Sequence, residues 1–66
     1  MVEGWELVFS STAEFEATII LELLEKHELH PVILNRRDNE FQIGDVEVYV
    51  APEEKEAALR VIKGDN

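Results

Sequence analysis

The clearest structural signal in the chain is Val46-Glu47-Val48-Tyr49-Val50-Ala51-Pro52, a strand pattern that leads directly into a helix start. The alternation over residues 46–50 has the period of two that is typical of a half-buried strand. A helix is expected to begin at Pro52, because the first helical position does not use the amide hydrogen that proline lacks. Gly64 is a natural stop for this helix. Three of its apolar residues are expected to face the core: Ala58, Val61 and Ile62.

A second strand and helix are expected at the start of the chain. Residues 5–9 alternate in part and predict a strand. One face of this strand is expected to carry Trp5, Leu7 and Phe9, and the other Glu6 and Val8. Ser11 and Glu14 have the spacing of a capping box, which predicts that a helix begins there and runs to about His27.

Two apolar stripes run along this first helix. The stripe expected to face the sheet consists of Ala13, Ala17, Ile20 and Leu24. The stripe expected to contact the second helix consists of Phe15, Ile19 and Leu23.

The middle of the chain completes the sheet. Pro31 disfavours helical geometry at His30, so a strand is expected over residues 32–35. Residues 41–43 are consistent with either a strand extension or a loop. The order β-α-β-β-α and a right-handed crossover place the third strand between the other two. The expected fold is therefore α+β and ferredoxin-like, with antiparallel neighbours in a three-stranded sheet of order 1-3-2 and both helices on one face. No residues remain for a fourth strand, which leaves strand one as an open edge.

The composition restricts the function. A chain of 66 residues is expected to form a single domain, residues 1–66. The absence of cysteine excludes disulfides, thiolate metal sites and a cysteine nucleophile. A formal net charge of −9 repels nucleic acids and anionic membranes, so neither is an expected partner. The first residues lack the pattern of a signal peptide and no apolar run could span a membrane, so a cytoplasmic location is expected.

Few residues offer chemistry. His27 and His30, together with Glu25 or Glu28, carry atoms that bind divalent metals, but the helix is expected to end between the two histidines. The hydroxyl residues at 10–12 lie roughly 20 Å from both histidines, at about 1.5 Å per helical residue, too far for a base to activate a nucleophile. We therefore expect no catalytic residue, no metal site, no cofactor and no enzymatic activity.

Several features along nearly the whole chain resemble one protein family. They are the strand over 5–9, Glu16-Ala17, Leu24-Glu25, the extended segment at Pro31, the strand-to-helix junction over 46–52, and Ala58. The family is that of the prokaryotic signal-transducing proteins, small bacterial domains. The resemblance implies a ferredoxin-like fold akin to that of the PII-type nitrogen regulators, and it carries over no catalytic residue. Glu28 departs from the family pattern, because glycine often stands at this position.

An interaction surface is expected on the sheet face that the helices leave uncovered. Apolar strips on such faces often mark interfaces, and Trp and Tyr are enriched among the residues that dominate binding energy. The alternative is that β-propensity alone placed these residues there. The basic pair in the loop could anchor an acidic partner or the carboxylates of a second copy. The expected surface consists of Trp5, Val8, Ile33, Arg36, Arg37 and Tyr49.

These observations favour a non-enzymatic regulatory or protein-interaction module of the signal-transducing kind. It is expected to bind a protein partner, or itself as a homodimer, through the exposed sheet face and the edge of strand one. The alternative is a small-ligand or metal-sensing domain of the PII-like type.

Overall fold

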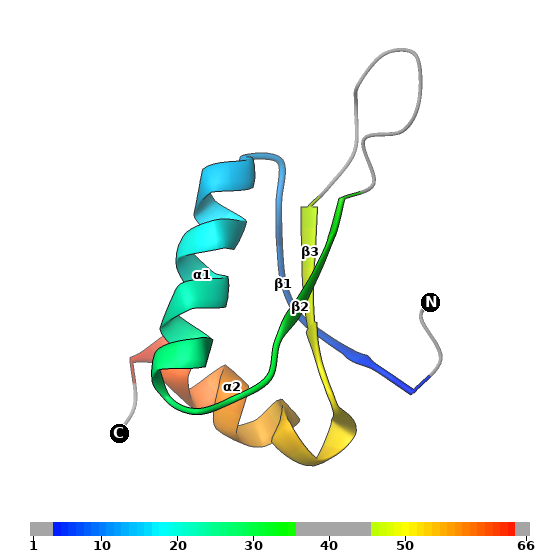
Figure 1. Cartoon of the computed structure of the whole chain (residues 1–66), viewed down its shortest axis with the longest axis vertical. Coiled ribbons are helices and arrows are strands. Elements are labelled where there is room, and N and C mark those ends of the chain that lie inside the picture. Colours follow the sequence, from blue (N-terminus) through cyan, green and yellow to red (C-terminus); the bar gives the residue numbers. More distant parts are fainter. Residues whose placement is uncertain (1–3, 36–45, 65–66) are drawn as a thin grey trace.

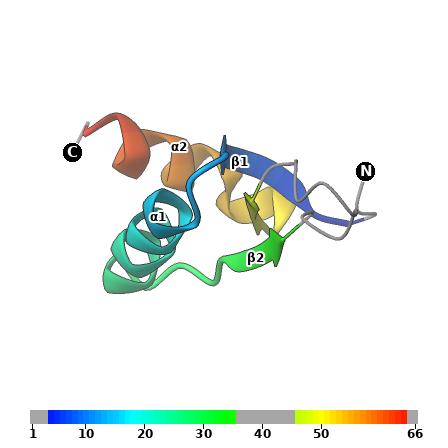
Figure 2. The ribbon, with the colours of Figure 1, turned by 90° about the horizontal axis from the view of Figure 1, so that it is seen from above.

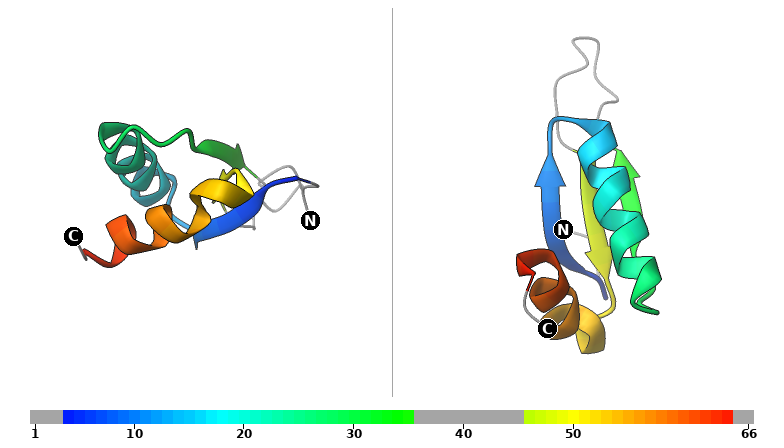
Figure 3. Two further views of the ribbon diagram at one scale, coloured as in Figure 1. Left: turned by 90° about the horizontal axis from the view of Figure 1, so that it is seen from below. Right: turned by 90° about the vertical axis from the view of Figure 1, so that its left-hand side faces the viewer.

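The computed structural model of the chain describes residues 4–35 and 46–64. Its elements are β1 (Glu6–Ser11), α1 (Glu14–Lys26), β2 (Val32–Asn35), β3 (Val46–Val50), the short 3₁₀ helix η1 (Pro52–Glu54) and α2 (Lys55–Lys63). β3 pairs antiparallel with β1 on one side and β2 on the other, which gives the order β1-β3-β2. Both helices lie on one face of the sheet (Figure 1; Figure 3, right). The predicted α+β fold and strand order are confirmed, whereas residues 41–43 lie outside the described residues.

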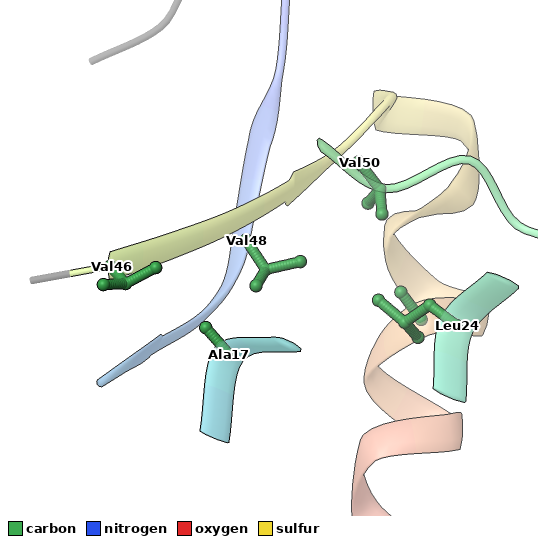
Figure 4. Packing of buried hydrophobic residues seen from close by; sticks show 6 residues of the cluster. Ala17, Leu24, Val46, Val48 and Val50 are labelled. Carbon is green, nitrogen blue, oxygen red and sulfur yellow. The ribbon is translucent and has the colours of Figure 1, made fainter. Parts of the chain in front are cut away.

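The core lies between the helices and the central strand. The three valines of β3, Val46, Val48 and Val50, are completely buried, and so are Ala17 and Leu24 of α1 and Ala58 of α2. Figure 4 shows these side chains converging in the space between strand and helices. Alanine at position 17 lets α1 approach the sheet closely, while Leu24 fills the volume near α2. The predicted core positions Ala17, Leu24 and Ala58 are confirmed, and Ile20, Val61 and Ile62 pack against them. Ala13, also predicted to face the sheet, is instead the N-cap residue of α1 and is not part of this cluster.

A β-bulge divides β1 into two parts. Leu7 pairs with Tyr49 and Phe9 with Val48, so one extra residue, Val8, is inserted between two consecutive residues of β3. An extra residue changes which face the following side chains occupy and bends the strand. β1 accordingly bends, and its N-terminal part runs in a different direction from the rest of the strand (Figure 1). The prediction that Trp5, Leu7 and Phe9 share one face is therefore wrong.

The second apolar stripe of α1 is also placed differently from the prediction. Phe15 is 67% exposed and Ile19 is 56% exposed. At 3.6 residues per turn, both lie on the side of α1 opposite to Ala17 and Leu24. α2 crosses near the C-terminal end of α1 instead of lying along it, so it leaves this stripe uncovered (Figure 1).

The start of α1 uses a different cap from the one predicted. The N-cap residue is Ala13, which has no side chain to cap the helix. Ser11, the last residue of β1, accepts a hydrogen bond from the Ala13 amide at 3.0 Å, and its hydroxyl donates to the carboxylate of Glu16. The expected pair of Ser11 and Glu14 is thus replaced by Ser11 and Glu16, because the strand continues two residues further than expected.

The end of α1 is closed by a residue in a left-handed conformation. Glu28 has a φ of 66°, a region that normally favours glycine. Its amide donates to the carbonyl of Glu25 at 2.9 Å, and the amide of Leu29 donates to that of Leu24 at 3.1 Å. These two bonds form a Schellman motif, and Leu29 packs against the core beside it. α2 ends in the predicted way, with Gly64 at a φ of 85°.

The contrast between the two faces of α1 predicts very different costs for two truncations. Leu24→Ala is expected to lower the free energy of unfolding by about 3 kcal/mol, because it opens a cavity in the core. Ile19→Ala, the matched control on the exposed side, is expected to change it by less than about 0.5 kcal/mol. Urea denaturation followed by circular dichroism measures both. Equal losses would contradict the placement of these two residues.

The backbone at Glu28 predicts an unusual order of stability for two substitutions. Glu28→Gly is expected to be more stable than Glu28→Ala by about 1 kcal/mol, because only glycine adopts a positive φ without strain. Both variants remove the same charge, so they differ only in the Cβ atom. In a helix interior the order is reversed, with alanine favoured by a similar amount. Thermal denaturation that finds the alanine variant more stable would contradict the left-handed conformation.

Candidate interaction surface

The strand register determines which residues lie on the sheet face away from the helices. Residues directly opposite each other in an antiparallel pair project to the same face. Since Val48 faces the core, its neighbours along β3 face the other way. On this open face Tyr49 lies between Leu7 and Val32, and Glu47 lies between Ser10 and Leu34. Figure 2 shows the sheet edge-on, with the helices on one side only.

Three aliphatic side chains on the open face are accessible to solvent. Leu7 is 44% exposed, Val32 is 41% exposed and Leu34 is 36% exposed. They come from both outer strands and flank the central strand. We call these three residues, together with Tyr49 and Glu47, the open-face patch.

Tyr49 forms the centre of the open-face patch, but it is only 5% exposed. Its hydroxyl donates a hydrogen bond to the carboxylate of Glu47 at 2.8 Å, two residues earlier on the same face. The ring therefore lies along β3, and its polar tip is bound to the acidic side chain. Sequence analysis placed Tyr49 in the interaction surface on this face of the sheet. The tyrosine does lie on this face, but its aliphatic neighbours Leu7 and Val32 provide the exposed area.

Other predicted surface residues are placed differently. Val8, at the bulge, packs against the core. Ile33 pairs with Val48, which puts it on the helix side of the sheet, although it is 38% exposed at the edge. Trp5 is half-buried. The pair Arg36 and Arg37 lies outside the described residues.

Leu7, Val32 and Leu34 were missed in the sequence reasoning. For Val32 and Leu34 a signal existed. Once Val48 is taken to face the core, the register of the β2–β3 hairpin places Ile33 on the same side as Val48, and Val32 and Leu34 on the open face. For Leu7 no local signal was available. Its face depends on the bulge, and an uninterrupted alternation predicts the opposite side.

The outer edges of β1 and β2 are the second feature of this surface. Within residues 4–35 and 46–64, each of these strands pairs only with β3. Unpaired amide and carbonyl groups on an edge strand form a template for an additional strand. β2 carries no charged residue that would hinder such pairing, whereas β1 carries the bulge.

The two histidines have separate partners. The Nδ1 atom of His27 lies 3.0 Å from the carbonyl oxygen of Leu23. His30 contacts Glu54 twice, with its amide donating to Oε1 at 2.9 Å and its Nδ1 atom 2.8 Å from Oε2. No group of three or more potential ligands that could hold a metal ion occurs among the described residues. The His30–Glu54 pair instead joins the segment before β2 to the start of the C-terminal helix.

Each partner of this pair changes the titration of the other. The hydrogen bond to Glu54, and then its negative charge, raise the pKa of His30 above the ordinary 6.5. The side-chain and main-chain hydrogen bonds from His30 lower the pKa of Glu54 below the ordinary 4.5. The side chain of His30 is 84% exposed, whereas that of Glu54 is 18% exposed.

Comparisons with known proteins add no assignment to these observations. The chain matches no protein-family model, no curated protein and no solved structure at the level of a significant match. The resemblance to prokaryotic signal-transducing proteins therefore stays a prediction, as does the alternative of ligand or metal sensing. Within the described part of the chain, no helix has the length and apolar character needed to cross a membrane.

The His30–Glu54 pair predicts a specific pH dependence. A raised histidine pKa stabilises the fold below pH 6.5, and this contribution is lost as the pH rises through the folded-state pKa. A lowered glutamate pKa stabilises it above pH 4.5, and this contribution is lost as the pH falls through the folded-state value. The pair thus contributes most between these two values.

An NMR titration measures this coupling directly. The pKa of His30 is expected to lie above 6.5 in the wild type and to return towards it in Glu54→Gln, which keeps an acceptor but removes the charge. The same midpoint in both proteins would show that the pair is not formed in solution.

Proposed function

We propose that this protein is a non-catalytic interaction module that binds a protein partner or a second copy of itself through the open-face patch and the neighbouring edge of β1. The observation that carries the proposal is the group of Leu7, Val32 and Leu34, which are exposed together on the sheet face away from the helices. A regulatory, signal-transducing role follows from the sequence resemblance and is part of the same proposal.

The chemistry of the patch favours association over catalysis. Aliphatic side chains bury apolar area on contact but supply no acid, base or nucleophile. The one ionisable carboxylate of the patch, that of Glu47, is engaged by the hydroxyl of Tyr49. The hydroxyl of Ser11 at the start of α1 is likewise occupied, by the Ala13 amide and by Glu16.

The distribution of charge makes a second copy the first occupant to test. The chain carries a formal net charge of −9, which opposes contact between most pairs of its surfaces. The open-face patch contains a single acidic residue, so two such faces meet with little local repulsion. In the described part of the chain β1 pairs with β3 alone, so the stretch of β1 that follows the bulge leaves an edge to which an additional strand could add.

Analytical ultracentrifugation over a range of protein concentrations tests this proposal. The wild type is expected to self-associate, and more strongly at high salt, because salt screens the net charge. Leu34→Ser is expected to weaken the association about tenfold or more, the loss typical of a residue that dominates an interface.

Leu59→Ser is the matched control. Leu59 lies on α2 and is 36% exposed, the same fraction as Leu34, so an equal loss of apolar surface occurs away from the patch. It is expected to associate like the wild type. A wild type that is monomeric at every concentration would contradict self-association, and equal effects of the two variants would contradict the assignment to this face.

A further inference from the structure

α1 presents an apolar stripe that neither the core nor the open-face patch uses. Phe15 and Ile19 are 67% and 56% exposed, the two highest values among the large apolar residues of the described part. They lie one helical turn apart on the outer side of α1. Leu23, half-buried, follows one turn later and extends the stripe along the helix.

Glutamates border this stripe on both sides. The residues three positions before and after Ile19 are Glu16 and Glu22, so they are its nearest neighbours on the two flanks of the helix. Both are exposed. Over its whole length α1 carries four glutamates and one lysine, Lys26 in the last turn. We call Phe15, Ile19 and Leu23 with these two flanking glutamates the acidic-bordered stripe.

The fold does not require the acidic-bordered stripe. The core-facing side of α1 is already provided by Ala17 and Leu24, which are completely buried. A phenylalanine that is two-thirds exposed loses the free energy that burial would give it, at about 25 cal/mol for each Å² of apolar surface. A polar residue at position 15 or 19 would serve α1 equally well as a solvent-facing position.

We propose that the acidic-bordered stripe binds a basic amphipathic helix of another protein. Such a helix places apolar residues at a spacing of three and four against Phe15, Ile19 and Leu23, and lysine or arginine residues opposite Glu16 and Glu22. The apolar contacts supply affinity, and the charge pairs supply orientation and a fast encounter.

The charge of the stripe identifies the occupant. If a second copy bound through the same stripe, Glu16 and Glu22 of one copy would face the glutamates of the other. In α1 only Lys26 carries a positive charge that would offset this repulsion. A nucleic acid or an anionic membrane would meet the same repulsion. A partner helix with positive charges on both sides of an apolar stripe meets no such repulsion. Its apolar residues match Phe15, Ile19 and Leu23, and its charges are opposite to those of Glu16 and Glu22.

A synthetic helix of leucine and lysine, with all leucines on one face, is the probe. Titration into the ¹⁵N-labelled protein is expected to give its largest shifts at the amides of Phe15, Ile19 and Leu23. A peptide of the same composition is scrambled so that the leucines share no face. It is expected to bind at least about tenfold more weakly, because only the charge attraction remains. A leucine–glutamate version is expected not to bind.

Three variants test the assignment by calorimetry with the same probe. Ile19→Ser is expected to weaken binding about tenfold. Glu16→Gln combined with Glu22→Gln is expected to weaken it and to flatten its dependence on salt. Leu34→Ser is expected to bind like the wild type, since it alters the open-face patch and leaves α1 unchanged. The last variant separates this proposal from the proposed self-association.

Several outcomes would overturn the inference. Equal binding of the scrambled peptide would reduce the interaction to unspecific charge attraction. Shifts that map to Leu7, Val32 and Leu34 would assign the probe to the open-face patch. Loss of self-association in Ile19→Ser would make a second copy the occupant. Absence of binding to the amphipathic probe would exclude this partner class.

Discussion

The burial of β3 is the constraint on which the rest of the structure depends. Its three valines are completely buried under α1 and α2, and the strand pairs with a neighbour on each side. Among the elements of residues 4–35 and 46–64, no other one combines full burial of one face with pairing on both edges. α1 approaches it closely because residue 17 is alanine, and Leu24 lies at the end of the core near α2 (Figure 4). Ala58 of α2 belongs to the same buried cluster.

The bulge in β1 links this core to the candidate surface. Val8 is an extra residue in β1, between Leu7, which pairs with Tyr49, and Phe9, which pairs with Val48. Phe9 therefore packs against the core, while Leu7 lies on the open face. Glu6 falls on the helix side, where its carboxylate accepts a hydrogen bond from the ammonium group of Lys55 in α2 at 3.1 Å. A single inserted residue therefore supplies the core with an aromatic ring, joins β1 to α2, and leaves an aliphatic side chain exposed beside Tyr49.

The two exposed apolar surfaces differ in their electrostatics, and the partners proposed for them differ accordingly. The open-face patch holds one carboxylate, already bonded to the tyrosine hydroxyl. The stripe on α1 has glutamates along both flanks. With an excess of nine negative charges, the protein repels acidic molecules except where such charges are locally sparse. The proposed self-association through the sheet and the proposed recognition of a basic helix through α1 are thus compatible, since the two surfaces lie on opposite layers of the molecule (Figure 2).

The sequence by itself determined the elements that depend on local chemistry. The bounds of β2 and β3, the stop at Gly64 and the core positions Ala17, Leu24 and Ala58 follow from periodicity and from the tolerance of glycine for positive φ. The missing amide of proline predicts a helical turn at Pro52, where the structure has the 3₁₀ helix η1 before α2 begins at Lys55. The strand order followed from the rule for crossovers. Only the tertiary structure decided the bulge, the faces of Leu7 and Ile33, the burial of Tyr49, the exposure of Phe15 and the pairing of His30 with Glu54. Each of these depends on residues far apart in the chain, and a one-residue change of register exchanges the two faces of a strand without any change in its local sequence pattern.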